Sequence, residues 1–250
     1  MILKPPKGAM LNRGSNYARG LVGCWLMNEG GGTIVNDLSG NGQSLLFDAT
    51  TPPAWDSGKY GPCVTGVDDK ILGTAPAVNS TSPGDMSVVA WYKVNSIASS
   101  YGIVITTNLY ISSSVLGGSG WCLGHSYGQS PPRPTFWLGP DSDTANQIRV
   151  GNDGSYTIPL SEWVMVAATF DSATKTAYLY INGVYQVSDT EANATSYAHT
   201  QLSFFQGNDS HSSQELNGSI SHSLVYNRAL SATEMLNLYR SPFCMFEVDL

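Results

Sequence analysis

Residues 36–43 read NDLSGNGQ and combine two asparagines, one aspartate and two glycines with a single apolar side chain. Oxygen-rich segments of this kind can surround a hard cation. The same composition is typical of a tight turn, because Asn, Asp and Gly tolerate left-handed backbone angles and cap their own turns. The sequence therefore predicts a turn, with a cation site as the alternative.

Paired carboxylates that could cleave a glycosidic bond are not evident. Glycosidases need two carboxylates about 5 to 9 Å apart, and alternate acids on one strand provide them. The six glutamates stand singly, without an acid two residues away on a predicted strand, and Asp141 and Asp143 alternate only within a predicted loop. Four histidines are scattered along the chain, at His125, His199, His211 and His222. We therefore expect a noncatalytic protein, with a triad of distant residues left open.

The composition favours many short strands over helices. Only 12% of the residues are charged, against about 25% in typical globular domains, and glycine occupies 26 positions. The net charge of −7 with 12 Lys and Arg argues against binding nucleic acid or anionic membranes, because both need a basic surface. We therefore expect neither as a partner.

The N-terminus and the cysteines predict a reducing compartment. MILKPPKGAMLNRG lacks the apolar core of a signal peptide, so we expect synthesis in the cytoplasm without the secretory route. No stretch approaches the roughly 18 apolar residues of a membrane span. The cysteines show neither C-x-x-C pairs nor metal-ligand spacing, which predicts free thiols at Cys24, Cys63, Cys122 and Cys244.

The elements that must position these residues alternate with a period of two. Both faces are largely apolar in MSVVAWYKV, residues 86–94, and in WVMVAATF, residues 163–170, which predicts strands covered on both sides. TAYLYINGVYQV predicts a hairpin that turns at Asn182 and Gly183, and IRVGNDGSYTI predicts another around residues 152–154. LSATEMLNLYR predicts a helix, because Ser231 and Glu234 form a capping box and Pro242 follows its end.

The chain resembles the laminin-G-like, concanavalin A-like jelly rolls. GLVGCWLMNEGGGTIVNDLSGNGQ is similar to their opening, and SGKYGPCV, SVVAWYK, SEWVMVAATFDSATKTAYLYINGV and LNGSISHSLVYNRALSATEMLNLY follow in the family's order. The resemblance implies an all-β fold, a two-sheet antiparallel jelly-roll sandwich with one short helix near the C-terminus. It divides the chain into an N-terminal extended arm (1–17), a laminin-G-like jelly roll (18–240) and a C-terminal tail (241–250).

The resemblance also bears on residues 36–43. In many relatives the matching loop helps to hold calcium near an acid of the closing strand, and Asp37 is the carboxylate that matches, with Asn41 as an added oxygen. This chain has Ser221 after Ile220, where relatives usually have Asp. Because calcium affinity follows the charge of the ligands, we expect either no cofactor or a weak structural calcium.

The two ends of the chain resemble phage-encoded relatives of this domain, in PPKGAMLNR and LYRSPFCMFE. We predict a noncatalytic phage virion surface protein, a capsid decoration or tail appendage, that adheres to glycans. Its place would be the virion surface after synthesis in the host cytoplasm. The expected partners are other virion proteins or copies of itself, contacted through the arm and the tail, and surface glycans.

A soluble carbohydrate-binding lectin module is the alternative function, and a glycoside hydrolase is the third. A lectin would use exposed aromatic rings as stacking platforms. The candidates outside predicted strand cores are Trp55, Tyr60, Tyr101, Tyr110, Tyr127, Tyr156 and Tyr197. Core or hairpin packing explains each of them equally well, so the sequence selects no ligand-binding residue.

Overall fold

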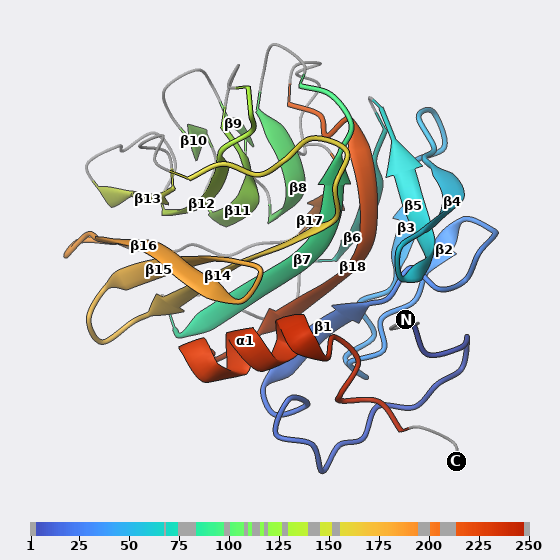
Figure 1. The fold of residues 1–250 in the computed structure, drawn as a ribbon, viewed down its shortest axis with the longest axis horizontal. Coiled ribbons are helices and arrows are strands. Elements are labelled where there is room, and N and C mark those ends of the chain that lie inside the picture. The colour runs from blue at the N-terminus through green and yellow to red at the C-terminus, as the bar shows by residue number, and fades with distance from the viewer. Residues whose placement is uncertain are drawn as a thin grey trace.

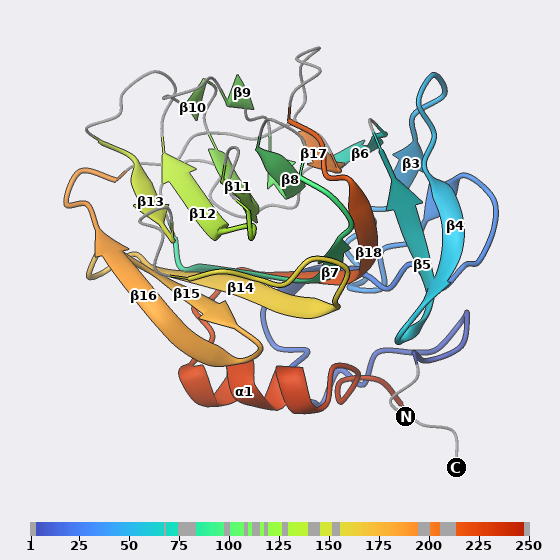
Figure 2. The ribbon, with the colours of Figure 1, turned by 45° about the horizontal axis from the view of Figure 1, so that its top comes forward.

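The computed structural model describes residues 4–67, 69–74, 84–97, 101–107, 110–111, 116–117, 120–126, 130–139, 146–151, 156–194, 201–205 and 214–247. These residues form two antiparallel sheets packed face to face, with one short helix in the described part below one of the sheets (Figures 1 and 2). The predicted jelly-roll sandwich is confirmed. The predicted turn at residues 152–154 lies outside the described residues.

The first sheet contains the long strands whose sequences are apolar on both faces. Its order is β16 (Val184–Thr190), β15 (Thr176–Ile181), β14 (Val164–Asp171), β7 (Met86–Val94), β18 (Gly218–Tyr226), β5 (Gly61–Gly66) and β4 (Ala54–Gly58), and β1 (Leu21–Trp25) also pairs with β18. The two central strands, β7 and β18, lie far apart in the sequence, so the centre of the sheet forms only when distant segments meet.

The second sheet contains shorter strands and lies across the first. Its order is β13 (Ile148–Val150), β12 (Pro134–Gly139), β11 (Gly120–His125), β8 (Gly102–Thr107), β17 (Gln201–Phe204), β6 (Ile71–Thr74), β3 (Leu45–Phe47) and β2 (Ile34–Val35). A two-stranded ladder joins β9 (Tyr110–Ile111) to β10 (Leu116–Gly117).

The space between the sheets is filled by one apolar core, and β7 shows how it is built. Alternate side chains of β7 point into this core, from Met86 to Val94, and none of them is exposed. The intervening Val89 and Trp91 point to the opposite face and are equally buried. The first sheet is therefore covered on both faces, as its double apolar pattern predicts.

The outer face of the first sheet is covered by a third layer. Helix α1 (Ala232–Arg240) packs on it through Met235 and Leu238, and lies beneath the sheet in Figure 2. The predicted capping box is present, since Ser231 accepts from the Glu234 backbone and the Glu234 side chain accepts from the Ser231 backbone.

The two ends of the chain complete this layer and lie close together (Figure 1). Leu11 and Phe246 form an antiparallel bridge, Asn12 N–H donates to the Met245 carbonyl at 2.8 Å, and Glu247 N–H donates to the Met10 carbonyl at 3.0 Å. The apolar residues of the tail, Phe243, Met245 and Phe246, are buried against the chain's own sheet. The described parts of the arm and tail thus pack on their own domain.

Lys4 fixes the beginning of the described arm. Its ammonium donates to the carbonyls of Pro62, Ser221 (2.7 Å) and Met27 (3.5 Å), and its backbone N–H donates to the Tyr60 carbonyl. Three acceptors match the three N–H groups of an ammonium. Burial lowers the pKa of Lys4 to about 7, against the opposing effect of Cys63 and Glu29.

The predicted hairpin turn and the predicted free cysteines are both confirmed. The β15–β16 hairpin turns at Asn182 and Gly183, whose φ angles of 51° and 78° are the left-handed values that this turn requires. The four cysteines are free, and Cys244 is exposed while the other three are buried. In the part of the chain that the structure describes, no helix is long and apolar enough to cross a membrane.

The exposure of the cysteines gives a first prediction. A thiol-reactive reagent should label Cys244 alone in the native protein and all four cysteines after denaturation without reductant, because three thiols are buried in packed sheets. Mass spectrometry of the labelled protein measures both numbers. Cys244→Ser is the control and should abolish native labelling. Fewer than four labels after denaturation would reveal a disulfide.

Candidate functional site

The loop at residues 36–43 is organised around the carboxylate of Asp37. Its Oδ1 accepts from the backbone N–H of Cys24 (3.0 Å) and Ser39 (2.8 Å). Its Oδ2 accepts from the Ser39 hydroxyl (2.8 Å) and the Gln43 N–H (3.0 Å). Asp37 therefore closes its own turn and also ties that turn to β1.

Asn41 strengthens the same connection. Its side-chain amide donates to the carbonyls of Leu21 and Val22 in β1 and to the Ser39 hydroxyl. Ser221 lies in β18, where its hydroxyl is 2.9 Å from Nδ1 of His222. A calcium ion at Asp37 would have to compete with four protein donors, so the geometry favours the turn. No cluster of three His, Cys, Asp or Glu suited to a metal occurs among the described residues. Calcium binding by Asp37 and Asn41 stays a prediction.

Several of the described carboxylates accept hydrogen bonds within turns. Asp48 accepts from Thr50 and Thr51, Asp171 from Ala173 and Thr174, and Glu191 from Asn193. The Thr50 side chain lowers the pKa of Asp48, and the Thr174 N–H lowers that of Asp171. A general acid needs the opposite shift. Asp141 and Asp143 lie outside the described residues.

The two described histidines are buried. Burial lowers the pKa of His125 to about 4, and burial and then Lys4 lower that of His222 well below its usual value. His222 stacks on Trp91 with ring centroids 4.0 Å apart. Both histidines are therefore neutral packing residues at pH 7. His199 and His211 lie outside the described residues.

The aromatic candidates occupy different environments. Trp55 stacks on Phe47, Tyr60 is buried beside His222, and Tyr101 meets Trp137 edge to face. Tyr156 is half-buried, Tyr127 and Tyr197 lie outside the described residues, and the side chain of Tyr110 does too. The structure adds Tyr185, which is 49% exposed beside Tyr178 and Tyr180 and which the sequence reasoning missed because it sits inside a predicted hairpin.

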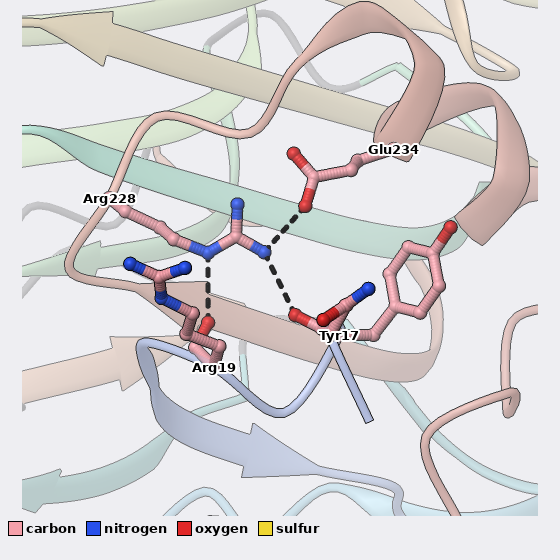
Figure 3. A pocket seen from close by; sticks show the side chains of 5 residues that line it. Tyr17, Arg19, Arg228 and Glu234 are labelled. Carbon is pink, nitrogen blue, oxygen red and sulfur yellow. Dashed lines mark hydrogen bonds and ion pairs between the residues drawn. The ribbon is translucent and has the colours of Figure 1, made fainter. Parts of the chain in front are cut away.

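A polar cavity of about 460 Å³ lies where the segment before β1 meets the start of α1. It is lined by Asn16, Tyr17, Arg19, Arg228 and Glu234. Figure 3 shows Arg228 at its centre, where Nε donates to the Arg19 carbonyl (2.8 Å) and Nη2 donates to the Asn16 carbonyl (3.2 Å). Nη2 also forms an ion pair of 2.7 Å with Glu234.

Local backbone geometry allows Arg228 to take this position. Gly20 has a φ of 74°, and a Cβ at this residue would lie only 3.1 Å from the Cδ of Arg228. The Arg228 guanidinium also lies over the ring of Tyr226, 5.5 Å from its centroid. Glu234 completes the arrangement from the first turn of α1. Burial alone would raise the pKa of Glu234, but the bonds from Arg228 and Ser231 lower it, so the carboxylate is ionised.

Two further cavities lie on other faces. One of about 500 Å³ separates the arm from the tail and is lined by Lys4, Pro5, Pro6, Lys7, Gly8, Ala9, Met10, Phe243, Phe246 and Glu247. The other, of about 660 Å³, is a shallow surface around β3 and β6 that includes Leu46 and Leu72. The cavity at Arg228 is lined by an ion pair, Arg228–Glu234.

A family model of the concanavalin A-like lectin/glucanases superfamily matches residues 66–235. The chain belongs to this superfamily. None of the curated proteins matches the sequence significantly.

Several solved structures that share this fold are binding domains. The binding domain of Paraclostridial Mosquitocidal Protein 1 is 15% identical with a TM-score of 0.65, over 91% of this chain and 53% of that one. The binding domain of botulinum neurotoxin serotype D is 15% identical with a TM-score of 0.64, over 91% and 52%. The binding domain of botulinum neurotoxin DC, in complex with SialylT, is 12% identical with a TM-score of 0.61, over 90% and 52%. The chain spans about half the length of these structures, and at these identities the likeness shows the fold alone.

The geometry at Asp37 predicts a structural rather than a metal-dependent role. EDTA should leave the melting temperature unchanged. Asp37→Ala should lower the free energy of unfolding by about 2 kcal/mol, because it leaves several donors without an acceptor. Chemical denaturation with and without chelator measures both effects.

Asp48→Ala is the matched control, because its bonds stay within one exposed turn, and it should cost less than about 1 kcal/mol. A melting temperature that falls in EDTA and recovers with calcium would contradict the structural interpretation.

The buried histidines predict a loss of stability in acid. His125 has a pKa of about 4 in the folded chain, whereas the unfolded chain takes up the proton near pH 6.5. Between these values the unfolded state binds more protons, so the free energy of unfolding should fall by up to about 3 kcal/mol between pH 7 and pH 4. His125→Phe should flatten this part of the profile in urea denaturation. An unchanged slope would show that His125 is not the group responsible.

Proposed function

We propose that this chain is a noncatalytic glycan-binding domain displayed on the surface of a phage particle. The observation that carries the binding role is its membership of a superfamily of lectins and glucanases, combined with the use of its described carboxylates. A glucanase needs two acids held free for catalysis. Asp37, Asp48, Asp171 and Glu234 are instead committed to turns, caps and an ion pair.

The structural neighbours support binding over catalysis. They are binding domains, and one of them is in complex with SialylT while another is in complex with rat synaptotagmin II. Those ligands belong to those proteins. For this chain the complex with SialylT supports a surface glycan as the partner class, in line with the polar cavity at Arg228.

The virion location is supported by the resemblance of the two chain ends to phage-encoded relatives. The apolar residues of the tail pack on their own sheet, so contacts with other virion proteins or other copies must use different residues of the ends. Met10 of the arm, which is 69% exposed next to the arm–tail cavity, is one such residue. A soluble lectin module is the second candidate, because the same fold and cavity serve binding without a particle.

Two measurements test this proposal. The purified chain should bind at least one class of immobilised glycan on an array and should release no reducing sugar from it. Quantitative mass spectrometry of purified particles should find the protein in a fixed copy number. If the chain binds glycans but is absent from particles, the soluble lectin module remains as the function. An array without any bound glycan would contradict the glycan-binding role.

A further inference from the structure

The cavity at Arg228 carries more positive charge than its acid neutralises. Two arginines, Arg19 and Arg228, line it together with a single carboxylate, Glu234. In the described part of the chain no acid forms an ion pair with Arg19, whose side chain is exposed. The lining therefore has a net charge of about +1 in a chain whose total is −7.

Arg228 is held in place before any ligand arrives. Two main-chain carbonyls and Glu234 fix its Nε and Nη2, and the Tyr226 ring supports one face. The remaining nitrogen, Nη1, makes no bond to a described residue, and Figure 3 shows it directed away from the Arg19 carbonyl. A guanidinium that is already ordered loses little conformational entropy when it binds a further group.

Glu234 limits which anion the cavity accepts. Its Oε1 pairs with Arg228 and its Oε2 accepts from the backbone and the hydroxyl of Ser231. The net charge of the lining balances a monoanion, whereas a dianion such as phosphate would leave one negative charge uncompensated beside the Glu234 carboxylate. The planar fork of Arg19 matches a carboxylate, which it can hold by two parallel bonds.

We infer that this cavity binds the carboxylate of an acidic sugar, with Arg19 and Arg228 as the anion-binding residues. This assignment rests on the proposed glycan-binding function and names the class of glycan. The volume of about 460 Å³ lies at the lower end of the range for small-molecule pockets, roughly 300 to 1,000 Å³. The amide of Asn16 and the ring of Tyr17 add polar and flat surface for the rest of the sugar.

The test compares three probes by NMR titration of the intact chain. The probes are the methyl glycoside of N-acetylneuraminic acid, the methyl ester of that compound, and sodium phosphate. The acid should bind and shift the resonances of residues 16–19 and 228–234. Its binding should be weaker in 0.5 M NaCl, because the site is exposed. The ester and phosphate should bind at least about fivefold more weakly.

Matched variants separate a binding role from a structural one. Arg19→Gln should lower the affinity for the acid probe at least about fivefold. It should leave the melting temperature unchanged, because only the backbone of Arg19 supports Arg228. Arg240→Gln makes the same change of charge at the exposed end of α1 and should leave binding unchanged. Glu234→Gln retains a residue suited to the capping box. It should increase the affinity for the acid probe, because it removes the competing carboxylate.

Equal binding of acid and ester, stronger binding of phosphate, or wild-type affinity in Arg19→Gln would overturn the assignment. The proposed function can survive these results if the array still shows neutral glycans bound equally by wild type and Arg19→Gln. An array without bound glycans removes the proposed function, whereas the NMR titration still reports on the cavity itself.

Discussion

The burial of β7 and β18 on both faces is the constraint on which the rest of the molecule depends. An aromatic side chain buries roughly 150 to 250 Å², which is worth about 4 to 6 kcal/mol at 25 cal/mol/Å². Trp91 and Tyr226 point out of the sandwich and are fully buried, so a two-layer jelly roll would leave this surface in water. Helix α1, the arm and the tail supply the missing cover. They behave as a structural layer rather than as appendages.

Covering that face also brings polar groups out of water, and their contacts follow from it. The arm places Lys4 over the sheet, where its ammonium donates hydrogen bonds to main-chain carbonyls of three segments. His222 stays neutral between Trp91 and Phe243. Asp37, Asp48 and Asp171 lie in turns, where their carboxylates accept hydrogen bonds from backbone N–H groups.

The local parts of this architecture could be predicted from the sequence, because their causes are local. Asn182–Gly183 sets the hairpin by its left-handed angles, and Ser231 with Glu234 sets the start of α1. The double apolar pattern of residues 86–94 predicted cover on both faces but could not say what provides it. Arg19 and Arg228 could not be paired from the sequence. They are separated by more than two hundred residues, and their meeting depends on β1 pairing with β18.

That pairing explains why a cavity forms at this place. β1 and β18 run antiparallel, so the start of β1 lies beside the end of β18, and the segments outside them, residues 16–20 and 227–231, leave the sheet together. Beyond the bond from the Asn227 N–H to the Gly20 carbonyl, these segments form no strand ladder, so their carbonyls need other donors. Arg228 meets this need for Asn16 and Arg19, and Gly20 gives it room. A guanidinium recruited to satisfy a strand end is thereby ordered, solvent-accessible and next to a second arginine, and these are the properties that an anion site requires.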